Sequence, residues 1–120
     1  MNSLIEGVLY VVDDQQDMCD VMAMTMEQYD IRLDTSRTFD EAVKALHLYG
    51  ILIVDNDLSS PGKDGNLLAK MFKEIRPAGY VIMVSGWSPN LRCSNEFVDT
   101  FMIKPFDVPE MVALIRALSL

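Results

Sequence analysis

The sequence predicts a doubly wound α/β fold, with a five-stranded parallel sheet and helices on both faces. Strand-like and helix-like segments alternate along the whole chain, as expected when each strand is joined to the next parallel strand by a helix. The stretches 8–12 and 51–54 are continuously apolar, which is typical of strands buried on both faces of a sheet. The chain has 120 residues, half of them hydrophobic, so we expect one core and a single domain, residues 1–120.

The remaining elements follow from shorter patterns. We expect strands at 31–35, 80–84 and 101–103, and helices at 16–29, 38–49, 67–75 and 109–117. Thr38 followed by Glu41 has the spacing of a capping box at a helix start, and Gly50 is a stop signal. The stretch 87–99 contains Pro89 and mixed polar residues, so it has room for only a short fifth helix.

Acidic residues that follow the first and third strands indicate the topology. A shared site at these strand ends requires that the two strands be neighbours, which predicts the strand order 2-1-3-4-5 with right-handed crossovers. The sequence contains no linker, internal repeat or low-complexity stretch, so we expect no output domain within it.

Composition excludes several classes of partner. The formal net charge is −8 and no run of Lys or Arg offsets it, which opposes direct binding to nucleic acid or to anionic lipid. No apolar run approaches the ~18 residues of a membrane span, and no secretory signal opens the chain. Cys19 and Cys93 lack the spacing of a zinc or redox pair. We therefore expect a cytoplasmic protein with free thiols.

Polar residues follow four of the expected strands. They are Asp13 and Asp14 after the first strand, Asp55 and Asp57 after the third, Ser85 after the fourth, and Lys104 before Pro105 after the fifth. In open parallel sheets, ligands bind beyond the carboxyl ends of the strands, so we expect these side chains to converge. Clustered carboxylates repel one another unless a cation compensates them, and Mg²⁺ is the hard cation that prefers oxygen ligands. Together with Lys104 and Ser85, this pattern favours phosphoryl transfer.

These motifs resemble the response-regulator receiver domains of two-component signalling over about residues 9–118. The resemblance rests on the acidic pair, the aspartate after the third strand, a Pro-Gly-Lys-Asp-Gly turn at 61–65, Ser85, and Lys-Pro-Phe at 104–106. It implies a flavodoxin-like fold and a switch that accepts a phosphoryl group from a histidine kinase or phosphotransfer protein. The output partner stays unknown. The only chemistry implied is self-catalysed phosphorylation and dephosphorylation, so the chain is not expected to be an enzyme.

The resemblance also implies a role for each site residue. Asp55 would be the phosphoacceptor, and Mg²⁺ would be held by Asp13, Asp14, Asp55 and the backbone carbonyl of Asp57, with Asp14 a more direct ligand than Asp13. Lys104 would pair with the phosphoryl group, Ser85 and Phe101 would form the switch, and the Lys104–Pro105 peptide would be cis.

Two features depart from the family pattern. In the family, a proline lies four residues after the phosphoacceptor, whereas Pro61 lies six after Asp55 and four after Asp57. Asp57 is therefore a rival acceptor, although the apolar run ending at Val54 favours Asp55 with a lengthened loop. The segment between Ser85 and Lys104 is shorter than usual for the family, which predicts a truncated or irregular helix there. Within it, Trp87 could either shield the phosphoryl group from water or simply cover the surface.

Two other classes of protein stay open. The stretch 51–57 resembles the first motif of haloacid-dehalogenase-like phosphatases, with Asp55 as nucleophile and Asp57 as general acid/base. That family places this motif on its first strand, whereas here an acidic pair comes earlier. A pseudo-receiver that only binds proteins is the second alternative, because intact site residues do not prove turnover. Phosphorylation and Mg²⁺ titration would separate these classes.

Overall fold

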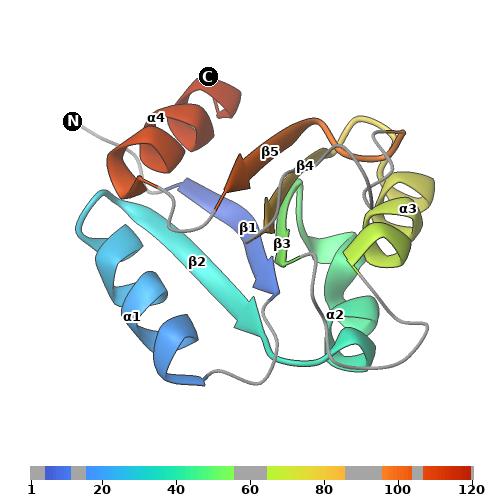
Figure 1. Cartoon of the computed structure of the whole chain (residues 1–120), viewed down its shortest axis with the longest axis horizontal. Coiled ribbons are helices and arrows are strands. Elements are labelled where there is room, and N and C mark those ends of the chain that lie inside the picture. The colour runs from blue at the N-terminus through green and yellow to red at the C-terminus, as the bar shows by residue number, and fades with distance from the viewer. Residues whose placement is uncertain (1–4, 12–15, 56–64, 86–95, 104–106, 120) are drawn as a thin grey trace.

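The computed structural model describes residues 5–11, 16–55, 65–85, 96–103 and 107–119. Within them, five strands form one sheet in which every neighbouring pair is parallel. The strands are β1 (Ile5–Val11), β2 (Ile31–Ser36), β3 (Ile51–Asp55), β4 (Tyr80–Ser85) and β5 (Thr100–Ile103), and their order is β2-β1-β3-β4-β5. The predicted fold class and strand order are confirmed (Figure 1).

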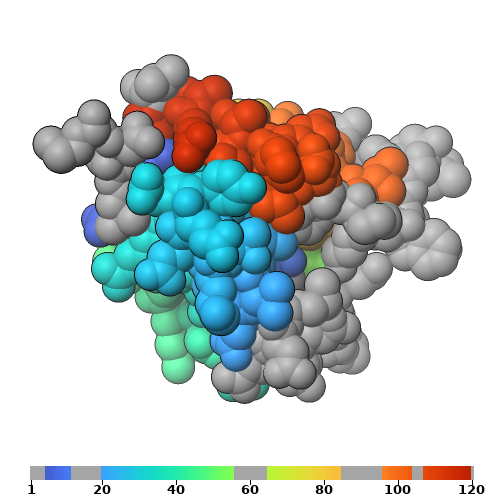
Figure 2. All heavy atoms as spheres, turned by 90° about the vertical axis from the view of Figure 1, so that its left-hand side faces the viewer, coloured from blue at the N-terminus to red at the C-terminus, as the bar shows by residue number. Residues whose placement is uncertain are grey.

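Helices cover both faces of the sheet. On one face lie α1 (Gln16–Glu27) and α4 (Val108–Leu118), which Figure 2 shows together on one side of the molecule. On the other face lie α2 (Phe39–Ala45), the short 3-10 helix η1 (Leu46–Leu48) and α3 (Gly65–Ile75). Side chains alternate along β3, so that Ile51 and Ile53 pack on the α1/α4 side and their neighbours pack on the α2/α3 side. Two hydrophobic cores therefore sandwich the sheet.

Several element boundaries differ from the sequence-based expectation. Thr38 does cap α2, since its side chain accepts a 3.1 Å hydrogen bond from the backbone N–H of Glu41, but the helix narrows into η1 after Ala45. The first helix ends at Glu27 rather than 29, because the chain turns through Asp30 with φ of 61°. Aspartate tolerates this left-handed conformation better than most residues do.

Strand β1 begins at Ile5, three residues before the expected start. Its pairing with β2 is irregular between Ile5 and Val8, where Gly7 has φ of +79°. The carbonyl of Gly7 accepts a 3.0 Å hydrogen bond from Gly50 N–H. A bulge of this kind interrupts the apolar pattern, which is why the strand start could not be read from hydrophobicity.

The predicted short helix within 87–99 falls mostly outside the described residues, and residues 96–99 are not helical. In the part of the chain that the structure describes, no helix is long and apolar enough to cross a membrane.

Gly79 tests how tightly α3 packs beside the start of β4. A Cβ added there would lie 2.5 Å from Cε2 of Phe72, a fully buried side chain. We expect Gly79→Ala to lower the free energy of unfolding by about 1–3 kcal/mol, because a closely packed ring must move. Gly50→Ala is the matched control, since an added Cβ there meets nothing within 4 Å. Urea unfolding measures the free energy of unfolding of both variants. Equal losses in Gly79→Ala and Gly50→Ala would contradict the close packing of Phe72 against Gly79.

Candidate functional site

The register of the sheet brings four strand ends to one edge. Val11, at the end of β1, pairs with Val54, and the next residue of β3, Asp55, pairs with Val84. Ser85, at the end of β4, pairs with Ile103 at the end of β5. Since all these strands are parallel, their carboxyl ends lie side by side, as the sequence predicted for the candidate site.

Among the predicted site residues at this edge, Asp55 is the one whose side chain the structure describes. It is the last residue of β3 and only 6% exposed. Among the described side chains, it is the only buried one that carries a formal charge. Burying a carboxylate costs free energy unless charge or hydrogen bonds compensate it. A buried aspartate at the ligand-binding edge of a parallel sheet is therefore the strongest indication of function among the described side chains.

Most of the other predicted site residues lie outside the described residues. These are Asp13, Asp14, Asp57, Trp87, Lys104 and Pro105, so the predicted Mg²⁺ ligands, the lysine and the cis peptide remain predictions. Their positions along the chain are nevertheless informative. The acidic pair follows Val11 by two and three residues, and Lys104 directly follows Ile103. Each thus leaves a strand that ends at the edge where Asp55 lies.

The side chain of Asp55 is a suitable ligand for a hard cation. Asp55 supplies carboxylate oxygens, which Mg²⁺ prefers. Within the described ranges, no group of three or more Asp, Glu, His or Cys residues could hold a metal on its own. The other Mg²⁺ ligands that the sequence predicts, Asp13, Asp14 and the backbone carbonyl of Asp57, lie outside the described ranges.

Phe101, the predicted switch aromatic, lies on β5 opposite Met83. It is partly buried and packs against the core on the α2/α3 side of the sheet. It is thus two residues before the end of a strand that leads into Lys104. Of Ser85, only the backbone is described, at the end of the neighbouring strand.

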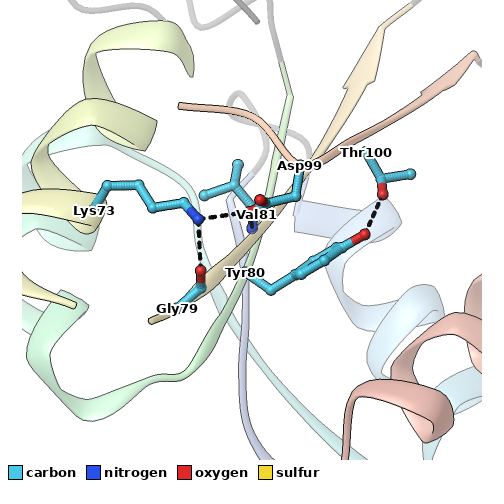
Figure 3. A network of polar contacts seen from close by, with 6 residues as sticks. All are labelled: Lys73, Gly79, Tyr80, Val81, Asp99 and Thr100. Atoms are coloured by element: carbon cyan, nitrogen blue, oxygen red, sulfur yellow. Dashed lines mark hydrogen bonds and ion pairs between the residues drawn. The ribbon is translucent and has the colours of Figure 1, made fainter. Parts of the chain in front are cut away.

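A polar network at the opposite end of β4 and β5 was not predicted from the sequence (Figure 3). Asp99 Oδ2 lies 2.7 Å from Lys73 Nζ and accepts a 2.8 Å hydrogen bond from Val81 N–H. Lys73 Nζ also donates to the carbonyl of Gly79, at 2.7 Å. Beside this network, the hydroxyls of Tyr80 and Thr100 share a hydrogen bond.

The network fixes the start of β5, whose far end leads to the candidate site. Asp99 N–H donates to the carbonyl of Val81 at 3.0 Å, so both backbone and side chain of Asp99 hold it to β4. Lys73 and Asp99 are separated by 25 residues, and neither belongs to a recognisable motif. No local signal in the sequence could have paired them.

Substitutions of Asp99 test this anchor. We expect Asp99→Ala to lower the free energy of unfolding by about 1–3 kcal/mol, because it leaves the N–H of the buried Val81 without its side-chain acceptor. Asp99→Asn keeps a carbonyl oxygen and loses only a partly exposed ion pair, so we expect less than about 1 kcal/mol. Denaturant unfolding compares the two variants. A larger loss in Asp99→Asn than in Asp99→Ala would contradict this ranking.

The chain thus has a doubly wound parallel α/β fold with a buried aspartate at the carboxyl edge of its sheet. In proteins of this fold class, ligands bind at that edge, where the strand order reverses. The chain matches the family model of the response regulator receiver domain over residues 9–116, and it belongs to that family. No curated protein matches it significantly.

Solved structures support the same fold. The chain is similar to a CheY-like response regulator receiver domain from Methanospirillum hungatei, with a TM-score of 0.82 and 23% identity over 97% of this chain and 94% of that one. It is also similar to the response regulator TrrA from Thermotoga maritima, solved in complex with Mg²⁺-BeF, with a TM-score of 0.78 and 21% identity over 92% and 97% of the two chains. TrrA was also solved in complex with the histidine kinase ThkA, and there the TM-score is 0.75 at 21% identity over 92% and 97%.

Proposed function

We propose that this chain is a phosphoacceptor switch, which takes a phosphoryl group onto Asp55 from a histidine kinase or phosphotransfer protein. The observation that carries this proposal is the burial of Asp55 at the carboxyl edge of the sheet. Membership of the receiver family supports it, as does a similar protein that was solved with a histidine kinase. The similar structure with Mg²⁺-BeF supports Mg²⁺ as the cofactor.

The transfer forms one bond and breaks another. A carboxylate oxygen of Asp55 attacks phosphorus while the bond to the donor's leaving group breaks, and the product is an acyl phosphate. When bound, Mg²⁺ would neutralise part of the charge on the transferred group. Its proposed protein ligands are Asp13, Asp14, Asp55 and the backbone carbonyl of Asp57. Lys104 follows the end of β5 and would pair with a phosphoryl oxygen.

The switch would use β4, which pairs with β3, and β5, which pairs with β4. The phosphoryl oxygens give the Ser85 hydroxyl a new acceptor, and its movement would make room that Phe101 can fill. Phe101 packs against the α2/α3 core while remaining partly exposed. A change in its rotamer would thus alter both the packing and the surface of β5.

The position of Asp55 also bears on the choice between the two candidate acceptors. If Asp57 were modified, the carboxylate that ends β3 at the ligand-binding edge of the sheet would have no part in the transfer, whereas Asp55 as acceptor places the reacting group at that edge. We therefore propose Asp55, with the turn after it longer than the family pattern.

Labelling by acetyl phosphate tests this proposal. With Mg²⁺ present, we expect the intact mass of the protein to rise by one phosphoryl group. Asp55→Asn should abolish the adduct, whereas Asp57→Asn should largely preserve it, because only the backbone carbonyl of residue 57 is used. Asp14→Asn should remove the Mg²⁺ dependence and most of the rate. Loss of the adduct in Asp57→Asn alone would move the acceptor two residues along.

The same experiment separates the other classes. A folded protein that forms no adduct with acetyl phosphate or a phosphorylated donor protein would be a binding module and would overturn the proposal. Sustained release of phosphate from small phosphate esters, lost in Asp57→Asn, would instead indicate a phosphatase.

A further inference from the structure

The outer edge of β2 is an open strand edge. β2 has six residues and lies at one end of the sheet, and no strand among the described residues pairs with its outer side. An edge strand presents backbone N–H and C=O groups that another strand can pair with. The exposed side chains on this strand are therefore the features that would select a partner.

Two opposite charges on β2 flank one apolar residue. Arg32 and Asp34 lie on either side of Leu33, with Arg32 Nε 3.5 Å from Asp34 Oδ1. Arg32 also lies 4.0 Å from Glu6 on β1. The side chain of Arg32 is 65% exposed and that of Asp34 is 39% exposed, so these ion pairs contribute little and can be exchanged for others at small cost.

A hydrogen bond from Tyr49 holds Asp34 in place. The Tyr49 hydroxyl donates to Asp34 Oδ2 at 2.8 Å. Burial of Tyr49, together with its bond to the Asp34 carboxylate, raises the pKa of Tyr49 to about 12. The hydroxyl is protonated near neutral pH, as that of an ordinary tyrosine is, so it donates to the carboxylate and orients it before any partner arrives.

We propose that β2 pairs antiparallel with β2 of a second copy of this chain, so that one sheet continues across both copies. If the twofold axis passes through Leu33, then Arg32 lies opposite Asp34 of the partner subunit, and Asp34 lies opposite Arg32 of the partner subunit. Opposite charges directly across from each other favour such a pair of strands. A strand that is complementary to itself in this way fits a second copy better than an unrelated strand.

An apolar surface beside β2 would be buried in the same contact. A cleft of about 350 Å³ lies between α1 and β2, and its apolar lining includes Ala23, Met24 and Leu33. Met24 is 66% exposed, and α1 lies open at the surface (Figure 2). A twofold axis perpendicular to the sheet would place the two α1 helices on the same face, where the Met24 side chains could cover the junction.

Repulsion sets an upper limit on the strength of this dimer. Each chain carries a net charge of −8, and Glu27 lines the same cleft as Arg32. A contact limited to one strand and part of one helix also belongs to the small, transient class of interfaces. We therefore expect a dissociation constant of roughly 10 μM to 1 mM. The dimer does not depend on phosphorylation of Asp55.

Charge reversal with rescue tests the proposal by analytical ultracentrifugation of the unphosphorylated protein, at concentrations up to about 1 mM and physiological ionic strength. Arg32→Glu and Asp34→Arg each place like charges opposite each other at two positions, so each alone should weaken the dimer about tenfold or more. An equimolar mixture of these two variants should form a heterodimer, because both positions then carry opposite charges.

The control variants are Lys70→Glu and Glu74→Arg, which make the same charge changes on exposed positions of α3. They should dimerise like the unmodified chain, alone or mixed. A chain that stays monomeric throughout this range would overturn the proposal. So would single β2 variants that dimerise normally, or a mixture that does not restore the dimer. Restoration also excludes misfolding, because two unfolded variants would not rescue each other.

Discussion

The structure depends on the parallel pairing of β1 with β3 at the centre of the sheet. Val8 to Val11 pair in register with Ile51 to Val54, and nearly all of these side chains are fully buried, because helices pack on both faces. This pairing requires that β2 lie on one side and β4 on the other, so the chain reverses its winding direction between β1 and β3. The strand ends at this reversal are where Asp55 lies and where the acidic pair follows β1.

Asp55 is both a buried residue of the central strand and the proposed phosphoacceptor. The same core that makes β3 a stable central strand also removes the carboxylate of its last residue from water. In the proposed function, a cation would compensate the charge of this carboxylate before and after the phosphoryl group is transferred. The proposed response to phosphorylation would thus begin at a residue that the core of the sheet holds in place.

Much of the fold could be predicted because the central strands are continuous apolar runs and helices join β1 to β2, β2 to β3 and β3 to β4. The capped start of α2 at Thr38 followed from a local motif, and local motifs can be read without a structure. The positions of the strand ends also predicted which edge carries the site. Burial of Asp55 was not predicted: the apolar run ends at Val54, but β3 extends one residue further and buries the Asp55 side chain.

Other features depend on contacts between distant parts of the chain. The anchor made by Lys73 and Asp99 forms only once α3, β4 and β5 are packed, and the early start of β1 depends on Gly7 in a left-handed conformation beside Gly50. The charge pattern of β2 is visible in the sequence, but it suggests pairing with another strand only once β2 is known to lie at the edge of the sheet. The residues proposed to complete the metal site leave the ends of β1 and β3, and their roles rest on the family resemblance.

We propose that the sheet presents Asp55 as the phosphoacceptor, and locating the modified residue tests this proposal most directly. Sodium borohydride reduces an aspartyl phosphate to homoserine, and mass spectrometry of peptide fragments then identifies its position in the unmodified sequence. We predict homoserine at position 55 after phosphorylation in the presence of Mg²⁺. Homoserine at position 57, with aspartate intact at 55, would contradict it.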